Sequence, residues 1–460
     1  MPRPHRPMLR TTASPARAAL AAGLALPLLL AACGGQDGSG EASGAPSAGA
    51  STPAGEPTPP SDVQEAAATT PRLAVTYDGG IRVLDATTLE TVADLPLEGF
   101  NRLNGAGDGR HLLVSTAGGF RVLDAGTWAE PHGDHDHYYT SAPELTDVLH
   151  AAEEPGHVVV HEGRTALFDD GTGAVTVLDS DEVAEGADGA RSLRTPSAHH
   201  GVAVELSDGS LVLSEGTEDE RTGVRVLDAS GQEVAANAQC PGVHGEAVAA
   251  DEVVVIGCED GALVVDGREI RKVQAPDAYG RIGNQAGTED SPIVLGDYKT
   301  DPDAELERPT RVSLIDTRDA SLRLVDLPAS YTFRSLGRGE DGEALVLGTD
   351  GALHVIDPAS GRVERSVPVV APWEEPVEWQ EPRPALRVLD GTAYVTEPAT
   401  RQVHAVDVAT GEVWKSADVG VVPNELAAVS GDAEEEHAHA HEEGEHADEH
   451  ADEDGPATTR

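Results

Sequence analysis

GGIRVLDATT, at residues 79–88, is the first of a series of related phrases along the chain. Its apolar residues alternate with other residues as in a half-buried strand, and an Asp followed by small polar residues is typical of a turn. The phrase recurs as GGFRVLDAGT (118–127), GAVTVLDSDE (173–182), GVRVLDASGQ (223–232), GALVVDGREI (261–270), RVSLIDTRDA (311–320), GALHVIDPASG (351–361) and RQVHAVDVATG (401–411). We therefore expect a chain assembled from similar β units.

Each unit contains more than the phrase itself. Two short apolar runs precede the phrase, as HHGVAVELSDGSLVLSEG precedes GVRVLDASGQ. Four short strands at a period of about 40 to 50 residues are the signature of a β-propeller, in which each unit is one blade. The sequence predicts an all-β fold with a single eight-bladed β-propeller, and a seven-bladed ring is the alternative.

The innermost strands decide how the ring closes. We expect them to begin near Arg102, His157, His200, His244, Arg281, Phe333, Pro384 and Asn424. The strand near Asn424 has no further strands after it, whereas residues 73–97 supply three strands at the other end of the domain. The ring is therefore predicted to close by pairing of its N- and C-terminal strands.

The N-terminus has the pattern of an export signal. Several Arg residues precede an apolar run at residues 18–30, which is too short to span a bilayer. The run ends Leu-Ala-Ala-Cys at residue 33, which resembles the bacterial lipobox and implies cleavage before Cys33 and lipidation of its thiol. A plain secretory signal is the alternative. The predicted segments are a lipoprotein signal peptide (1–32), a lipid-anchored flexible linker (33–70), the propeller (71–430) and a disordered tail (431–460).

The formal net charge of -49 limits the partners of the chain. Binding to nucleic acid needs Lys and Arg to neutralise phosphates, so a nucleic-acid partner is not expected. An anionic membrane surface is equally disfavoured, which leaves the lipid anchor as the only predicted membrane contact. The sequence also has no G-x-S-x-G elbow and no P-loop. We predict that the protein is not an enzyme and has no catalytic residues.

The segment PHGDHDHYYT, at residues 131–140, is rich in metal-ligand side chains. Imidazole and carboxylate together suit Zn²⁺ and similar ions, which makes His132, Asp134, His135 and His137 candidate ligands. No apolar period runs through the segment, so we expect a polar loop rather than a helix or a strand. The alternative is a solvated acidic loop.

Three more histidines stand at equivalent positions of successive blades. His157, His200 and His244 begin innermost strands, whose first residues meet at one mouth of the central channel. His199 precedes His200, and Glu246 follows His244 closely, so both add possible donors. Each histidine alone is more often structural than a ligand, but three at equivalent positions predict a metal site.

The loop at 132–137 connects a third strand to a fourth strand, and such connections normally lie on the face opposite these histidines. The loop is long enough to cross a mouth of the channel, so its position remains open. His161, at a first-to-second-strand turn, belongs to that opposite face and is a possible partner of the loop.

Two cysteines, Cys240 and Cys258, bracket a pair of short apolar runs. In a hairpin centred near Ala249 they fall opposite each other, at the distance that a disulfide needs. Export supplies the oxidising environment for this bond. Metal ligation by the cysteines is the alternative.

The C-terminal tail from Glu434 to Asp454 combines His with many carboxylates. Its charge and lack of large apolar residues predict disorder, and such His-rich tracts bind metal weakly. A role in solubility alone is the alternative. The candidate ligands of this weak site are His437, His439, His441, His446 and His450.

Several short motifs occur in an order that resembles the AztD-type zinc metallochaperones. They are GDHDHYY (133–139), HHGVAV (199–204), CPGVHGEA (240–247), GCEDG (257–261), GRIG (280–283) and WQEPRPAL (379–386). The resemblance covers about residues 71–430, and neither a lipid anchor nor a His-rich tail is required of that family. It implies an exported propeller that binds Zn²⁺ and passes it to the solute-binding protein of an ABC zinc importer.

Two functions remain open from the sequence: a zinc metallochaperone, and a cell-surface propeller that binds proteins without a tight metal site. For the first we expect a monomer, outside the cytoplasm, with His200 and His244 on the fixed side of the site and His199 or His157 nearby. The loop histidines 135 and 137 would complete this site, with His132 and Asp134 as exchange ligands. His and carboxylate also bind Cu²⁺ and Ni²⁺, so zinc is not the only candidate.

Overall fold

The computed structural model describes residues 63–133 and 135–432. These residues form 36 strands and two 3-10 helices, η1 (Ser180–Glu182) and η2 (Ala250–Glu252). No helix among them is long and apolar enough to cross a membrane. The all-β prediction is confirmed. Outside the described residues lie Asp134, the lipidation site Cys33 and the tail histidines 437, 439, 441, 446 and 450.

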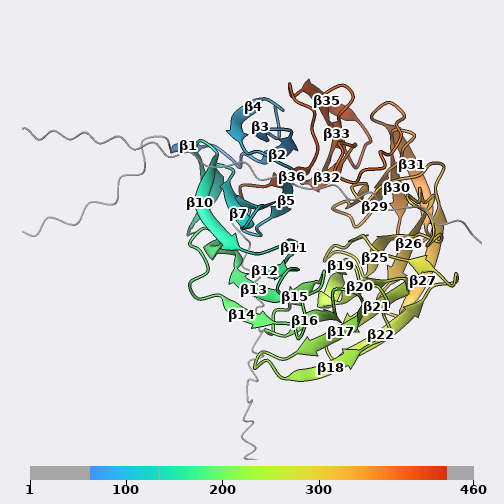
Figure 1. The fold of residues 1–460 in the computed structure, drawn as a ribbon. Coiled ribbons are helices and arrows are strands. Elements are labelled where there is room, and N and C mark those ends of the chain that lie inside the picture. The colour runs from blue at the N-terminus through green and yellow to red at the C-terminus, as the bar shows by residue number, and fades with distance from the viewer. Residues whose placement is uncertain (1–62, 134, 433–460) are drawn as a thin grey trace, which may run out of the picture. The chain divides into compact units, whose positions relative to one another are not determined.

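Most strands belong to sheets of four that are consecutive along the chain and surround a central space (Figure 1). One sheet contains β5 (Arg102–Gly105), β6 (His111–Thr116), β7 (Gly119–Asp124) and β10 (Glu144–Ala151). The next contains β11 (Pro155–His161), β12 (Arg164–Asp169), β13 (Ala174–Asp179) and β14 (Arg191–Arg194). The third contains β15 (Ala203–Glu205), β16 (Leu211–Gly216), β17 (Arg221–Leu227) and β18 (Glu233–Asn237).

Four further sheets follow the same plan. They contain β19 (Glu246–Val248), β20 (Val254–Cys258), β21 (Asp260–Asp266) and β22 (Glu269–Gln274), with β23 (Gly280–Arg281) beside β21; β24 (Gln285–Ala286), β25 (Ile293–Asp297), β26 (Arg311–Asp316) and β27 (Ser321–Asp326); β28 (Leu336–Arg338), β29 (Ala344–Leu347), β30 (Ala352–Asp357) and β31 (Arg362–Pro368); β32 (Leu386–Leu389), β33 (Thr392–Glu397), β34 (Gln402–Asp407) and β35 (Val413–Asp418).

One sheet joins the two ends of the described chain. It contains β36 (Leu426–Val429), β2 (Arg72–Tyr77), β3 (Gly80–Asp85) and β4 (Thr91–Pro96), in that order. The antiparallel ladder between β36 and β2 runs from Leu426 opposite Val75 to Val429 opposite Arg72. The innermost strand of each of these eight sheets begins within four residues of its predicted position.

The apolar residues pack between sheets rather than within one central core. The described residues contain eight buried hydrophobic clusters, and each is shared by two neighbouring sheets. One of them joins Leu73 and Leu84 to Val403, so the sheet of β2 packs against the sheet of β34. This arrangement leaves the first strands free to line the central space, as expected for a propeller-like fold.

The repeated Asp residues end their strands as the phrase predicts. All eight phrases lie on the third strand of a sheet. Asp85 accepts hydrogen bonds from the backbone amides of Thr87 and Thr88, 3.1 and 2.8 Å long. Asp357 makes the equivalent bonds to the amides of Ala359 and Ser360. These side-chain hydrogen bonds satisfy backbone amides that do not pair with a neighbouring strand, and they stabilise the turn in which the chain reverses direction.

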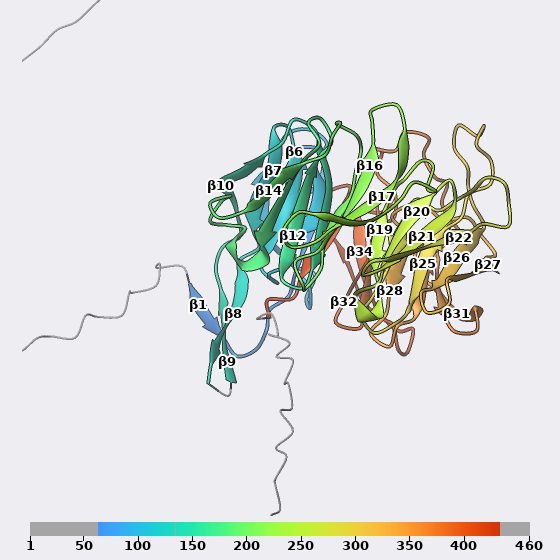
Figure 2. The ribbon, with the colours of Figure 1, turned by 90° about the horizontal axis from the view of Figure 1, so that it is seen from below.

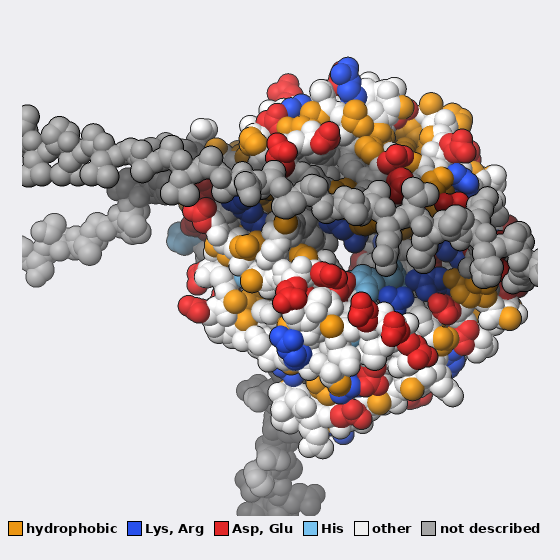
Figure 3. Space-filling model, viewed as in Figure 1, with side chains coloured by type: hydrophobic (Ala, Val, Ile, Leu, Met, Phe, Trp, Pro, Cys, Tyr) orange, Lys and Arg blue, Asp and Glu red, His pale blue; other side chains and the backbone are white. Residues whose placement is uncertain are grey.

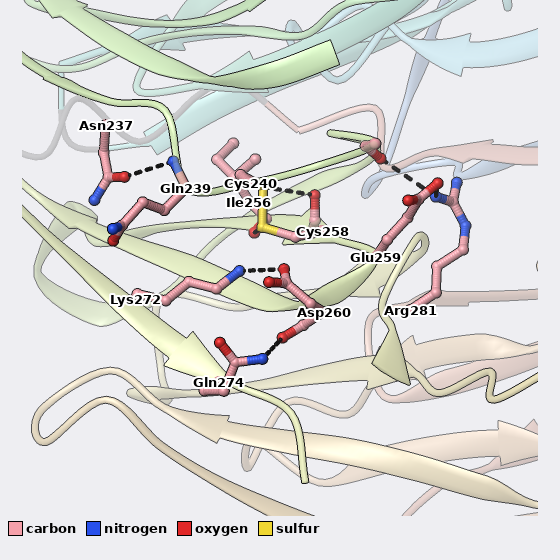
Figure 4. The surroundings of a disulfide bond; sticks show 12 residues. Asn237, Gln239, Cys240, Ile256, Cys258, Glu259, Asp260, Lys272, Gln274 and Arg281 are labelled. Carbon is pink, nitrogen blue, oxygen red and sulfur yellow. Dashed lines mark hydrogen bonds and ion pairs between the residues drawn. A yellow bond between two sulfur atoms is a disulfide. The ribbon is translucent and has the colours of Figure 1, made fainter. Parts of the chain in front are cut away.

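Cys240 and Cys258 are joined in a disulfide, and their Cα atoms are 5.0 Å apart (Figure 4). The hairpin register used to predict the pair is wrong. Glu246 lies opposite Ile256, which places the centre of the hairpin at residue 251 rather than near Ala249. Cys240 reaches Cys258 because the chain before β19 turns back, with the amide of Cys240 bonded to Thr222 O on β17.

Candidate metal centre

Three histidines from successive sheets meet at the start of the innermost strands. His157 is on β11, His200 precedes β15, and His244 precedes β19. One ring nitrogen of each lies within 4.8 Å of the others. We call these three residues the channel triad. Figure 3 shows histidine side chains gathered beside the central opening of the ring.

The spacing within the channel triad suits a single tetrahedral ion. The Nε2 atoms of His157 and His200 face each other at 3.2 Å. Two imidazole nitrogens on one tetrahedral Zn²⁺, each about 2.0–2.1 Å from the metal, are separated by about 3.3 Å. The ring of His244 is 5.0 Å from that of His200 and 5.7 Å from that of His157, measured between centroids. Three protein nitrogens leave a fourth position open to exchange.

The other ring nitrogen of each histidine is held by an acceptor. The Nδ1 atom of His157 lies 3.3 Å from Glu246 Oε1, and that of His200 lies 2.5 Å from Asp170 Oδ2.

His244 Nδ1 lies 2.6 Å from the carbonyl oxygen of Gly283. Because carboxylate and carbonyl oxygens accept hydrogen bonds, Nδ1 carries the proton in each ring and the Nε2 lone pair is free for a metal.

Burial and charge act differently on two members of the channel triad. Burial lowers the pKa of His244, and the neighbouring His157 and His200 add to this, so the pKa lies well below 6.5. Burial also lowers the pKa of His157, but the charge of Glu246 and its hydrogen bond outweigh burial and hold the pKa above 6.5. His244 is therefore neutral and ready to bind at neutral pH, whereas a proton competes for His157.

The zinc affinity of the channel triad is expected to fall as the pH falls. Because the pKa of His157 is raised, competition by its proton begins above pH 6.5. Below that pKa the affinity decreases about tenfold per pH unit for each proton that zinc displaces. Competition titrations with a chromophoric chelator from about pH 8 to about pH 5.5 measure this change. Glu246→Gln should move the onset to lower pH, and an affinity that stays constant over this range would contradict the assignment.

The segment at 131–140 is a β-hairpin and not the predicted polar loop. Its strands are β8 (Thr127–His132) and β9 (His135–Thr140), and β1 (Gln64–Ala66) pairs with β9. The hairpin is inserted between β7 and β10 and extends away from the ring (Figure 2). Stacking of Trp128 on Tyr139, with ring centroids 5.6 Å apart, supports the two strands without an apolar core.

The hairpin places a second group of imidazoles on one of its faces. His132 lies opposite His135, and His137 is two residues further along β9. Side chains two residues apart share a face of a strand, so the three rings lie together with centroids 5.0–5.3 Å apart. We call His132, His135 and His137 the hairpin triad. His137 Nδ1 also lies 3.1 Å from Glu65 Oε1 on β1.

The structure groups the predicted ligands into two separate triads instead of one composite site. His199 belongs to neither triad, because it is buried and its ring nitrogens contact Ser214 Oγ and Ser197 O, each at 2.9 Å. The possible pairing of His161 with the segment at 131–140 is not found among the described residues. His161 Nε2 instead lies 2.9 Å from Glu252 Oε1.

The groups behind the channel triad were only partly visible in the sequence. Glu246 stood out because it follows His244 in HGE. Asp170 lies in an ordinary Asp-Gly turn, and the carbonyl of Gly283 carries no side-chain signal. Contacts of this kind depend on how blades are placed beside each other, which sequence spacing does not give.

Comparison with known proteins gives a specific relative. The chain is 27% identical over 383 residues to the zinc chaperone AztD of Citrobacter koseri, and the match covers 81% of this chain and 89% of that protein. The crystal structure of AztD from the same organism superposes with a TM-score of 0.69 at 26% identity, covering 79% of this chain and 98% of that chain. The chain is a relative of AztD.

The resemblance to AztD predicted from the motifs is thus confirmed. A structure of apo AztD from Citrobacter koseri gives a TM-score of 0.67, with the same identity and coverage. No family model matches the chain. Since the AztD structure is covered almost completely, the likeness to AztD includes its whole fold rather than one part of it.

Proposed function

We propose that this chain is an extracytoplasmic zinc chaperone, which holds Zn²⁺ at the channel triad and passes it to the zinc-specific solute-binding protein of an ABC importer. The observation that carries the proposal is that one ring nitrogen of each of the three histidines lies within 4.8 Å of the others, while each Nδ1 contacts an acceptor oxygen. Similarity to a protein named zinc chaperone AztD supports zinc as the cargo.

The remaining features of the proposal follow from the sequence. They are a non-enzymatic monomer, a lipid anchor at Cys33 and a His-rich tail that collects metal weakly. An eight-bladed propeller closed by its terminal strands is part of the same proposal. Eight sheets with eight shared clusters, and the ladder between β36 and β2, support it.

Release of the ion requires that the site be open on one side. The fourth coordination position lets an acceptor ligand bind before any histidine leaves, so zinc can be exchanged one ligand at a time. Arg102 places a positive charge near His157, and Arg281 places one near His244. The same charges weaken the hold on a cation, which assists transfer.

Stopped-flow transfer from the zinc-loaded chain to the cognate solute-binding protein tests the proposal. With a chelator present in excess, zinc should reach the acceptor without being intercepted. Complete interception by the chelator would show simple release, and a chain without a tight zinc site would leave the protein-binding scaffold as its function.

The hairpin triad is expected to act as a separate, weaker site. His135→Ala combined with His137→Ala should remove one weak zinc equivalent and leave the affinity of the channel triad within about twofold, because the two triads share no ligand. Chelator competition that counts equivalents measures both quantities. Asp136→Ala is the matched control, since Asp136 lies between the two histidines and points to the other face of β9. Loss of tight binding in the double variant would contradict two independent sites.

A further inference from the structure

The strand β11 connects the two ends of the central channel. His157 stands near its start and His161 at its end. Four residues of strand correspond to about 13 Å, so His161 lies at the mouth opposite the channel triad. His161 is only 5% exposed, which is unusual for a histidine beside an opening. A buried imidazole normally has hydrogen-bond partners.

The partners of His161 include carboxylates from connections in two other sheets, those of β19 and β24. Its Nε2 atom lies 2.9 Å from Glu252 Oε1, and its Nδ1 atom lies 4.0 Å from Glu289 Oε1. Glu162 also brings a carboxylate oxygen within 4.8 Å of the other two ligand atoms. Glu252 is fixed in turn by Ser207, whose amide and hydroxyl donate to it at 2.9 and 2.8 Å.

Two of these residues have a costly backbone conformation. Glu162 has φ 46° and Glu252 has φ 56°, in the left-handed region that residues with a Cβ rarely adopt. Each such residue costs on the order of 1 kcal/mol or more, and such residues gather at functional sites. Glu162 lies in the turn between β11 and β12, and Glu252 lies in η2. These two connections bring both carboxylates close to His161.

A cavity extends from His161 to Glu246, which contacts His157 of the channel triad. The cavity has a volume of about 920 Å³, and its lining includes both His161 and Glu246, the partner of His157. Gln285 also lines it, and the amide nitrogen and oxygen of Gln285 are buried without a hydrogen-bond partner among the described residues. Glu289, Asp290, Glu340 and Asp390 line the cavity as well.

We propose that His161, Glu162 and Glu252 form a third site for zinc-type divalent cations, from which ions pass through the channel to the triad. The acidic lining concentrates cations at this mouth. One imidazole and two carboxylates bind Zn²⁺, and the exposed carboxylate of Glu162 allows faster exchange than a set of three half-buried histidines. The passage to the triad rests on the proposed zinc-binding function, whereas binding at His161 does not.

Anomalous diffraction at the zinc edge tests the site directly, with crystals of the full chain grown in zinc at a concentration that fills the channel triad. The expected result is a second peak between His161, Glu162 and Glu252, which disappears in Glu252→Gln and persists in Glu340→Gln. Glu340→Gln is the matched control because it removes a channel carboxylate outside the cluster. A peak at the triad alone would overturn the third site only, whereas absence of a triad peak would count against the proposed function.

The rate at which metal reaches the channel triad tests whether ions pass from the His161 site through the channel. Co²⁺ gives a strong visible absorption when it binds three histidines in tetrahedral geometry, so the rate of its arrival at the triad can be followed in solution. We expect Glu252→Gln and His161→Ala to slow loading about fivefold to tenfold with the same final absorption. His354→Ala controls for the loss of another buried histidine, which contacts Ser366 and Asp350. Loading of both cluster variants at the wild-type rate would overturn the path.

Discussion

His200→Ala is expected to lower the zinc affinity of the chain by about 100- to 1,000-fold, whereas His199→Ala should leave it within about twofold. The two residues are adjacent in the sequence, but only His200 directs its Nε2 atom toward His157, at 3.2 Å. Loss of His200 leaves two imidazoles, which hold zinc much less firmly than three. Chelator competition on both variants, with the tail present and also removed at Glu434, measures the difference.

His199→Ala has a cost of another kind. His199 is 2% exposed and bonded to Ser214 and Ser197, so its removal leaves buried polar groups without partners. This lowers the free energy of unfolding by about 1–3 kcal/mol. Thermal unfolding should therefore show that His199→Ala is less stable than His200→Ala. Zinc titration should show that His199→Ala binds zinc more tightly than His200→Ala. Equal zinc affinities for the two variants would contradict the assignment of the triad.

The repeated phrase was sufficient to predict an all-β chain of similar four-stranded units, because each unit buries its apolar residues and turns its chain in the same way. Alternating apolar residues bury one strand face against the next sheet, and an Asp reverses the chain after the third strand, as Asp85 and Asp357 do. These are local rules, and they also located the first strands. The channel triad followed, since His157, His200 and His244 have equivalent positions in their blades.

The hairpin shows where local rules fail. Its strands have no apolar alternation, so the pattern favoured a loop. The strands instead depend on cross-strand contacts of Trp128 with Tyr139, and on pairing with β1, whose Glu65 is 72 residues away from His137. Predicting such contacts requires knowledge of which distant segments meet. The same limit applies to Glu252, which reaches His161 from 91 residues away.

Asp170→Asn is expected to weaken zinc binding about 10- to 100-fold without removing any ligand. Asp170 Oδ2 lies 2.5 Å from His200 Nδ1, so the carboxylate orients the ring, keeps the proton on Nδ1 and makes Nε2 a stronger donor. Asparagine has nearly the same shape and its side-chain oxygen still accepts a hydrogen bond. The variant therefore removes the negative charge that balances Zn²⁺ rather than the geometry.

The result for Asp170→Asn should be visible in rates as well as affinity. Zinc should leave the variant faster, because the less basic ring of His200 is the first to be displaced, and chelator-induced release followed by stopped flow measures that rate. Asp350→Asn is the matched control, since Asp350 Oδ1 lies 3.3 Å from Nε2 of the buried His354 outside both triads. An unchanged release rate in Asp170→Asn would mean that the charge behind His200 has no part in holding the ion, and that the three imidazoles alone set the affinity.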